Sequence, residues 1–151
     1  MRDRVDAGGG LISMSGYDNT STDFRANVLL APLGVAYVPP LVSLSCTVPV
    51  TSFAVHPITQ GLTDVTFCGG YGVADIGNST STRTPIAFYP GADGGLSPVG
   101  YAIQMGGGRA FVWGDEWIEF DSEWSTNAQI KQLWVNIFKW VAPQGCALQP
   151  N

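Results

Sequence analysis

The segment from Gly114 to Trp124 holds the densest group of side chains in the chain that could do chemistry. It reads GDEWIEFDSEW, so five carboxylates and two tryptophans follow directly behind the apolar run AFVW. A solvated surface does not usually interleave Trp, Ile and Phe with its charges, because large apolar side chains favour the protein interior. The composition of this segment therefore predicts a site rather than a surface that only confers solubility.

A divalent-cation site is the first interpretation of these carboxylates. Carboxylate oxygens are the hard ligands that calcium prefers, although the spacing here matches no EF-hand loop. Asp18 or Asn19, from a loop earlier in the chain, would add further oxygen ligands. The implied ion is Ca2+, and its candidate ligands within the segment are Asp115, Asp121 and Glu123.

Two other kinds of site and one structural role fit the same segment. Glu116 with Glu119 or Asp121 would polarise a water if burial beside a tryptophan raised the pKa of one carboxyl. Trp117 and Trp124 would stack on the faces of a sugar while the carboxylates accept hydrogens from its hydroxyls. Alternatively, the aromatic side chains dock the last helix and the acids stabilise its amino end. The segment follows a strand, where α/β folds bind ligands, which favours a functional role.

A nucleophile with a base is the second candidate constellation. Ser15 follows an apolar run at a turn, and a helix after such an elbow can direct amide hydrogens toward an oxyanion. His56 is the only histidine in the chain, so it would have to be the imidazole base. The residues around Ser15 depart from G-x-S-x-G at both glycine positions. The alternative is that Ser15 forms a turn and that His56 occupies a turn before a proline.

Charge and composition exclude several classes of partner. The formal net charge is −5, and the seven Lys and Arg residues form no cluster, whereas nucleic acids and anionic membranes require a basic patch. Neither glycine triplet has the Lys and Ser/Thr of a P-loop or the spacing of G-x-G-x-x-G. Cations and neutral ligands, including small molecules and carbohydrates, are therefore the expected partners.

The sequence predicts no membrane insertion and leaves the compartment open. No apolar run reaches the roughly 18 residues that span a bilayer, and the first residues lack the apolar stretch of a signal peptide. Cys46, Cys68 and Cys146 permit at most one intramolecular disulfide, and which pair forms it is open. A single histidine and the lack of a CxxC pair argue against structural zinc.

Strand and helix signals alternate at the two ends of the chain. Residues 11–14 read as a buried strand and residues 24–33 as a helix that begins after Thr20, Ser21 or Thr22 and ends at Gly34. Short or edge strands are expected within 35–55, and further strands at 64–68, 86–89, 99–105 and 109–113, with a loop at 78–84. The last two strands are expected to form a hairpin at the glycine triplet 106–108. Residues 130–141 read as an amphipathic helix capped by Ser125 or Thr126.

Three segments resemble the ordered landmarks of the class I glutamine amidotransferase-like superfamily. They are AGGGLISMSGY at 7–17, HPITQGL at 56–62 and GRAFVWGDE at 108–116, and together they span most of the chain. The likeness is to degenerate members, including the ThuA-like branch. It implies a flavodoxin-like fold, a nucleophile on a strand-to-helix elbow and activity at the carboxyl edge of the sheet.

The same resemblance shows departures from the family. Where true amidotransferases carry the elbow cysteine this chain has Ser15, and the segment of the catalytic His and Glu holds acids but no histidine. Glutamine hydrolysis by a Cys-His-Glu triad is therefore not expected. Family members usually have about two βα units before the Gly-rich strand, so the resemblance implies truncation at the N-terminus. The missing units would leave one edge of the sheet exposed. We expect a second copy of the chain to cover that edge, and the alternatives are that another protein or a rerouted local strand covers it.

These observations predict a single amidotransferase-like α/β domain over residues 1–151, a flavodoxin-like three-layer sandwich with a mostly parallel sheet and a β-hairpin near its C-terminal end. The expected function is hydrolysis of a small ester, lactone or amide, with Ser15, Glu116 and His56 as catalytic residues. The alternatives are a non-catalytic domain of an extracytoplasmic protein that binds carbohydrate or calcium, and a purely structural domain. The expected ligand-binding residues are Tyr17, Asp18, Trp117, Glu119 and Trp124.

Overall fold

The computed structural model describes residues 1–15, 25–43, 45–77, 80–91 and 94–143. Its main feature is a five-stranded sheet with the strand order β1-β7-β6-β5-β3. Only β1 and β7 are parallel, whereas β7, β6, β5 and β3 pair antiparallel with their neighbours. The strands of this sheet are β1 (Gly10–Met14), β3 (Ser52–Phe53), β5 (Thr82–Pro90), β6 (Leu96–Met105) and β7 (Gly108–Trp113).

The expected flavodoxin-like, mostly parallel sheet is therefore wrong. A parallel pair needs a crossover connection, usually a helix, but β5, β6 and β7 follow one another with short turns between them. Such turns can only join antiparallel neighbours. The expected hairpin near the C-terminal end is confirmed, because β6 and β7 pair from Gly100↔Trp113 to Met105↔Gly108.

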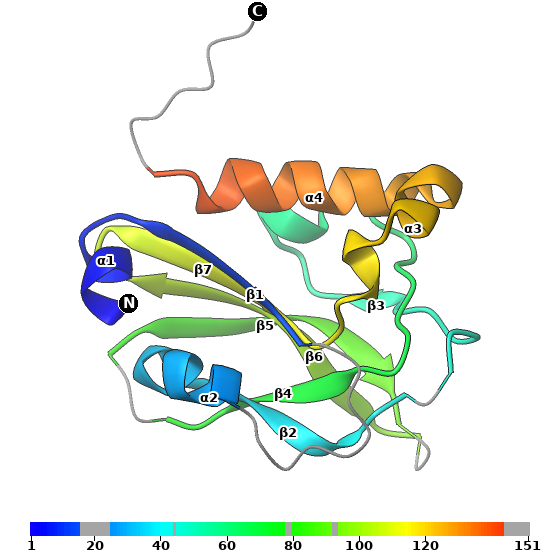
Figure 1. Ribbon diagram of the computed structural model, residues 1–151, viewed down its shortest axis with the longest axis horizontal. Helices are drawn as coiled ribbons and strands as arrows, with labels where there is room; N and C mark the ends of the chain where they lie inside the picture. Colours follow the sequence, from blue (N-terminus) through cyan, green and yellow to red (C-terminus); the bar gives the residue numbers. More distant parts are fainter. Residues whose placement is uncertain (16–24, 44, 78–79, 92–93, 144–151) are drawn as a thin grey trace, which may run out of the picture.

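Helices and a second sheet cover the two faces of the main sheet (Figure 1). On one face lies α4 (Ala128–Val141), with η2 (Pro57–Thr59), η3 (Trp117–Glu119) and α3 (Asp121–Thr126) around it. On the other face lie α2 (Arg25–Leu30), η1 (Ala31–Leu33) and a two-stranded antiparallel sheet of β2 (Val35–Leu41) and β4 (Tyr71–Asp75). The short α1 (Arg2–Asp6) precedes β1. Each face has its own hydrophobic core.

The amphipathic pattern near the C-terminal end correctly predicted α4. Its inward face, which includes Ile130, Leu133 and Ile137, is buried against the sheet. The expected caps at Ser125 and Thr126 are wrong, because these residues lie in α3 and the cap of α4 is Asn127, whose side chain accepts from the Gln129 amide. A short helix that the pattern did not predict, α3, therefore precedes α4.

Several other elements differ from the sequence expectation. Residues 64–68 form no strand, and only an isolated bridge joins Val65 to Val50. The expected helix at 24–33 is split into α2 and η1 and ends at Gly34, whose left-handed φ of 84° favours glycine. Its expected caps at 20–22 lie outside the described residues. Cys46 and Cys68 form a disulfide across this irregular region.

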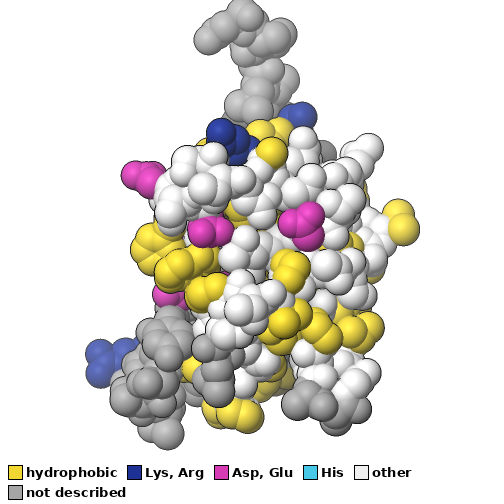
Figure 2. Space-filling model, turned by 90° about the vertical axis from the view of Figure 1, so that its right-hand side faces the viewer, with side chains coloured by type: hydrophobic (Ala, Val, Ile, Leu, Met, Phe, Trp, Pro, Cys, Tyr) yellow, Lys and Arg dark blue, Asp and Glu magenta, His cyan; other side chains and the backbone are white. Residues whose placement is uncertain are grey.

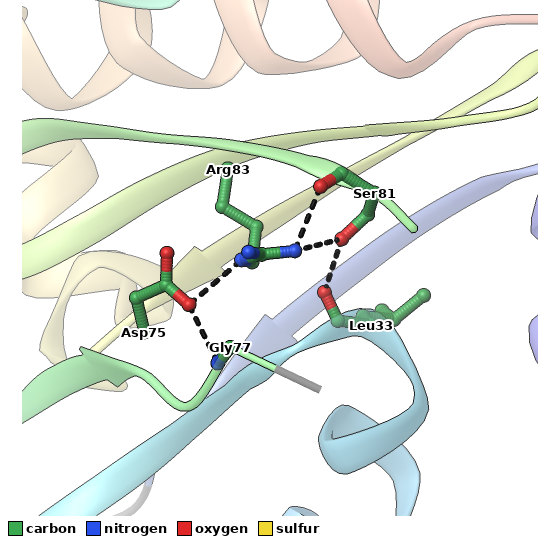
Figure 3. Close-up of polar contacts among 5 residues, drawn as sticks. All are labelled: Leu33, Asp75, Gly77, Ser81 and Arg83. Atoms are coloured by element: carbon green, nitrogen blue, oxygen red, sulfur yellow. Dashed lines mark hydrogen bonds and ion pairs between the residues drawn. The ribbon is translucent and has the colours of Figure 1, made fainter. Parts of the chain in front are cut away.

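A polar network ties the second sheet to the main sheet (Figure 3). Arg83 of β5 donates from Nε to Asp75 Oδ1 of β4 over 2.8 Å, and this hydrogen bond lowers the pKa of the Asp75 carboxyl. The same guanidinium donates to Ser81, whose hydroxyl in turn donates to the Leu33 carbonyl over 2.6 Å. These contacts fix β4 and η1 against the start of β5.

Candidate functional site

Ser15 and Asp115 lie close together in the fold, because they follow the adjacent parallel strands β1 and β7. The Ser15 amide donates to the Trp113 carbonyl, which continues the strand pairing by one residue. Gly114 separates Trp113 from Asp115, and a Cβ there would come within 1.9 Å of the Tyr71 carbonyl. Glycine thus lets β4 approach this end of the main sheet. The structure therefore places Ser15 and the start of the acidic segment at one edge, as the sequence predicted.

Asp115 is fully buried and serves the backbone rather than an open site. Its Oδ1 accepts from the Trp117 amide over 3.1 Å, and its Oδ2 accepts from the Cys68 amide. Burial raises the pKa of the Asp115 carboxyl to about 7, although both backbone hydrogen bonds act in the opposite direction. The carboxyl therefore joins the disulfide-bonded loop at Cys68 to the start of η3.

The other acidic side chains of the segment differ from Asp115 in that none of them is fully buried. Glu119 and Asp121 are exposed and Glu123 is half-buried, while one oxygen of Glu116, Oε2, is buried without a hydrogen-bond partner among the described residues. No group of three His, Cys, Asp or Glu side chains in the described part of the chain could hold a metal ion. In Figure 2 the acidic side chains on this side of the molecule stand apart from one another. The expected calcium site at Asp115, Asp121 and Glu123 is therefore not supported.

Of the two tryptophans of the segment, Trp124 packs against Trp134 of the last helix. Trp124 Nε1 and Trp134 Nε1 both donate to the Ile118 carbonyl, over 3.2 and 2.8 Å, and the two indole rings stack with centroids 6.3 Å apart. Trp117 makes an edge contact with Phe120. Trp124 is therefore engaged in docking α3 onto α4, which is the structural role that the sequence left open.

His56 lies away from Ser15. It caps η2, and its Nδ1 accepts from the Ile58 amide over 3.1 Å while its ring meets the Trp140 ring edge-on. The pocket that His56 lines also contains Arg109, which pairs with Gly10 at the opposite end of β1 from Ser15. Five residues of strand separate Gly10 from Ser15, or roughly 16 Å at about 3.3 Å per residue. The structure therefore does not bring the expected nucleophile and base together.

Tyr17 and Asp18, two of the expected ligand-binding residues, lie outside the described residues. Of the remaining expected residues, Glu116 and Trp117 are half-buried near Asp115, while Glu119 and Trp124 are exposed. The proposed acid-base pairs of Glu116 with Glu119 or Asp121 show no contact among the described side chains.

A pocket of about 580 Å³ surrounds His56, and sequence reasoning missed most of it. We call it the donor pocket. It lies where α4 and η2 meet the ends of β6 and β7 that are remote from Ser15. Three parts of the chain supply its lining, which comprises His56, Pro57, Gln60, Gln104, Arg109, Asn136, Lys139 and Trp140.

Hydrogen bonds hold the lining of the donor pocket in place. Arg109 donates to the Trp140 carbonyl over 3.0 Å, and its guanidinium lies 5.3 Å from the centre of the Trp140 ring. Buried Asn136 donates to the carbonyls of Ile58 and Gln60, which fixes η2 against α4. Arg109 and Gln104 are cross-strand neighbours, so they share one face of the sheet.

The lining of the donor pocket supplies hydrogen-bond donors and positive charge. Burial and the nearby Arg109 lower the pKa of the His56 ring, so His56 is neutral at pH 7. Because Nδ1 accepts from a backbone amide, the neutral ring carries its proton on Nε2 and can donate it. Arg109 and Lys139 add positive charge, and Gln60 and Gln104 add amides. The spacing of Asn136, Lys139 and Trp140 on α4 is a signal that could have indicated a shared face.

A second, larger groove of about 720 Å³ lies between the two sheets. Its walls come from β2, β4 and β6 and are mostly apolar, with Val38, Pro40, Leu41 and Pro98 among them. Asp75, the one charged side chain among the described residues of its lining, is engaged by Arg83. The groove therefore offers few polar groups that could orient a ligand.

No family model and no curated protein matches the sequence. The fold is similar to solved structures. The cytoplasmic protein STM3548 of Salmonella typhimurium aligns with 94% of this chain at 16% identity and a TM-score of 0.66. The cytoplasmic protein STM1381 of Salmonella typhimurium LT2 aligns with 92% of this chain at 16% identity and a TM-score of 0.64. The mmIFT52 N-terminal domain aligns with 96% of this chain at 13% identity and a TM-score of 0.68.

These similarities concern the fold alone. The chain spans 58% of the length of each Salmonella protein and 70% of the mmIFT52 domain chain. The expected membership of the amidotransferase-like superfamily stays a prediction. None of the helices in the described ranges is long and apolar enough to cross a bilayer.

Proposed function

We propose that this domain is a non-catalytic binding domain whose donor pocket takes a small acidic carbohydrate. The observation that carries the proposal is the convergence of Arg109, Lys139 and the Nε2–H of His56 around one pocket in a chain of net charge −5. Most of the acidic side chains lie elsewhere, so this concentration of donors calls for an explanation. A carboxylate is the group that such donors bind most strongly.

The remaining lining suits hydroxyl groups. Gln60 and Gln104 are exposed amides at the pocket, and each can donate and accept. A volume of about 580 Å³ lies within the usual range for small-molecule sites and exceeds what a lone inorganic anion requires. A sugar with one carboxylate would match both the cations and the amides.

The geometry gives less support to hydrolysis. Ser15 has no base at hydrogen-bond range among the described residues, and the buried Asp115 is already bonded to two backbone amides. General-base catalysis needs a base within reach of the proton that it removes. We therefore favour binding, which was the alternative to hydrolysis in the sequence analysis.

Titration with glucuronate, followed by amide chemical shifts and calorimetry, tests this proposal. We expect saturable shifts at His56, Gln60 and Arg109, with glucose binding much more weakly because it lacks the carboxylate. Acetate should also bind more weakly, because it lacks the hydroxyls. Equal binding of glucose would refute the role of the cations, and equal binding of acetate would refute the preference for carbohydrate.

A matched pair of lysine variants locates the site. Lys131 and Lys139 are both exposed on α4, but only Lys139 lines the donor pocket. We expect Lys139→Gln to weaken glucuronate binding by about five-fold or more, as loss of a charge-assisted hydrogen bond should do, and Lys131→Gln to leave it unchanged. No binding of glucuronate at tens of millimolar, or equal loss in both variants, would contradict the proposal.

A further inference from the structure

The outer edge of β1 has unpaired backbone groups. The Gly9 carbonyl accepts from the Arg109 amide, and the Ser15 amide donates to the Trp113 carbonyl, so both residues face β7. Backbone groups of successive residues alternate between the two edges of a strand. Gly10, Ile12 and Met14 therefore direct their N–H and C=O groups outward, and no described residue bonds to them.

Two other edge strands in this fold, β2 and β3, carry features that usually prevent association. Tyr37 in β2 exchanges two hydrogen bonds with the Asn27 side chain, which occupies the backbone groups there, and Pro39 and Pro40 follow. The edge strand β3, at the far side of the main sheet, is only two residues long. β1 has five residues without a charge, a proline or a bulge, so it lacks these features.

One exposed aromatic side chain, Phe138, lies on the same side of the molecule as this edge. Asn136 faces η2, and Phe138, two residues further along α4, points to the opposite flank of the helix. α4 packs over β7 and β1, so that flank overhangs the β1 edge. Phe138 is 53% exposed and stacks on Trp134, with ring centres 5.4 Å apart.

We infer that two copies of this chain associate through antiparallel pairing of their β1 strands about Ile12. The outward groups of Ile12 would pair with those of the other Ile12, and Gly10 would pair with Met14 at each end, giving about six hydrogen bonds. The main sheets then continue into one another across a twofold axis.

The chemistry of the edge favours a second copy as the occupant. Two copies of a chain with net charge −5 repel each other, but β1 is uncharged, so no like charges face each other in the pairing. With strands about 4.8 Å apart, the two α4 helices would lie roughly 10 to 15 Å apart on one face. The exposed Phe138 side chains would meet between them and bury apolar surface that β1 alone does not provide.

Two substitutions of Ile12 test the pairing directly. Ile12→Ala and Ile12→Pro both remove the half-buried side chain. Only proline also removes the outward N–H, to which no described residue bonds. In sedimentation velocity at about 100 µM, we expect the wild type and Ile12→Ala to reach twice the 16.0 kDa mass of the chain. Ile12→Pro should remain a monomer with the circular dichroism spectrum of Ile12→Ala.

A second pair keeps the test decisive if Ile12→Pro fails to fold. Phe138 and Val28 are both exposed, but Val28 lies on α2, on the other face of the sheet. Phe138→Glu should weaken the dimer at least ten-fold, because two carboxylates would face each other near the axis, and Val28→Glu should not. A monomeric wild type at 100 µM, a dimeric Ile12→Pro, or equal effects of the two glutamates would overturn the inference.

Discussion

The burial of Asp115 predicts an unusual dependence of stability on pH. Its pKa is raised from 3.8 to about 7 in the folded chain, mainly by desolvation. Between these two values the unfolded chain has lost the proton that the folded chain retains, so the free energy of unfolding must fall as pH rises. Each pH unit in this window removes about 1.4 kcal/mol, and the whole window about 4 kcal/mol. Above pH 7 both states are ionised and the effect levels off.

The perturbation that isolates this carboxyl is Asp115→Asn. The amide does not titrate, and its single oxygen can accept from only one of the two amides that Asp115 serves, those of Cys68 and Trp117. The other backbone N–H is left without its partner, at a cost of about 1 to 3 kcal/mol. The variant should therefore be less stable than the wild type at pH 5 and equal or superior to it at pH 8, where the wild type must bury a charge.

Urea denaturation followed by tryptophan fluorescence measures this difference. Measurements should begin near pH 5, because the isoelectric point is about 4.5 and solubility falls there. All other carboxyls titrate in both proteins, so the difference between the two curves reports Asp115. We expect it to change by about 3 kcal/mol from pH 5 to 8. A constant difference would refute the raised pKa, and a change of opposite sign would show that the two backbone hydrogen bonds outweigh desolvation.

Two further predictions concern the elements that hold the site together. Cys46→Ser opens a disulfide whose partners are 22 residues apart, and loop-closure entropy predicts a loss of about 3 kcal/mol in the free energy of unfolding, which the reduced wild type should reproduce. Asn136→Ala removes two hydrogen bonds to η2 and should cost about 1 to 3 kcal/mol, whereas Gln132→Ala, which removes only an exposed partner of Asn136, should cost less than about 0.5 kcal/mol.

Local patterns in the sequence predicted α4 and the hairpin of β6 and β7. The apolar spacing from Ile130 to Val141 defines α4 because one face of that helix is buried along its whole length. The hairpin of β6 and β7 follows from two strand signals separated by glycines. Strand direction is not encoded in such patterns, since a strand buried on both faces reads the same whether its neighbour is parallel or antiparallel.

The donor pocket could not be found in the same way. His56, Arg109 and Lys139 come from η2, β7 and α4, three segments that lie far apart in the sequence. Their proximity depends on how α4 and η2 lie on the sheet, which is set by contacts such as those of Asn136 with the carbonyls of Ile58 and Gln60. Sequence reasoning instead paired His56 with Ser15, which stands at the other end of β1.

The acidic and aromatic segment from Gly114 to Trp124 has a physical explanation that needs no ligand. The chain leaves β7 at Trp113 and must enter α4 at Ala128, so η3 and α3 turn it back over the face of the sheet. Short helices at such a reversal leave backbone groups without regular partners, and side chains supply them. Asp115 binds two amides, and two tryptophans bind the Ile118 carbonyl. A dense mixture of acids and aromatics after a strand can therefore mark a chain reversal as well as a site, and the number of backbone groups that each side chain binds distinguishes the two.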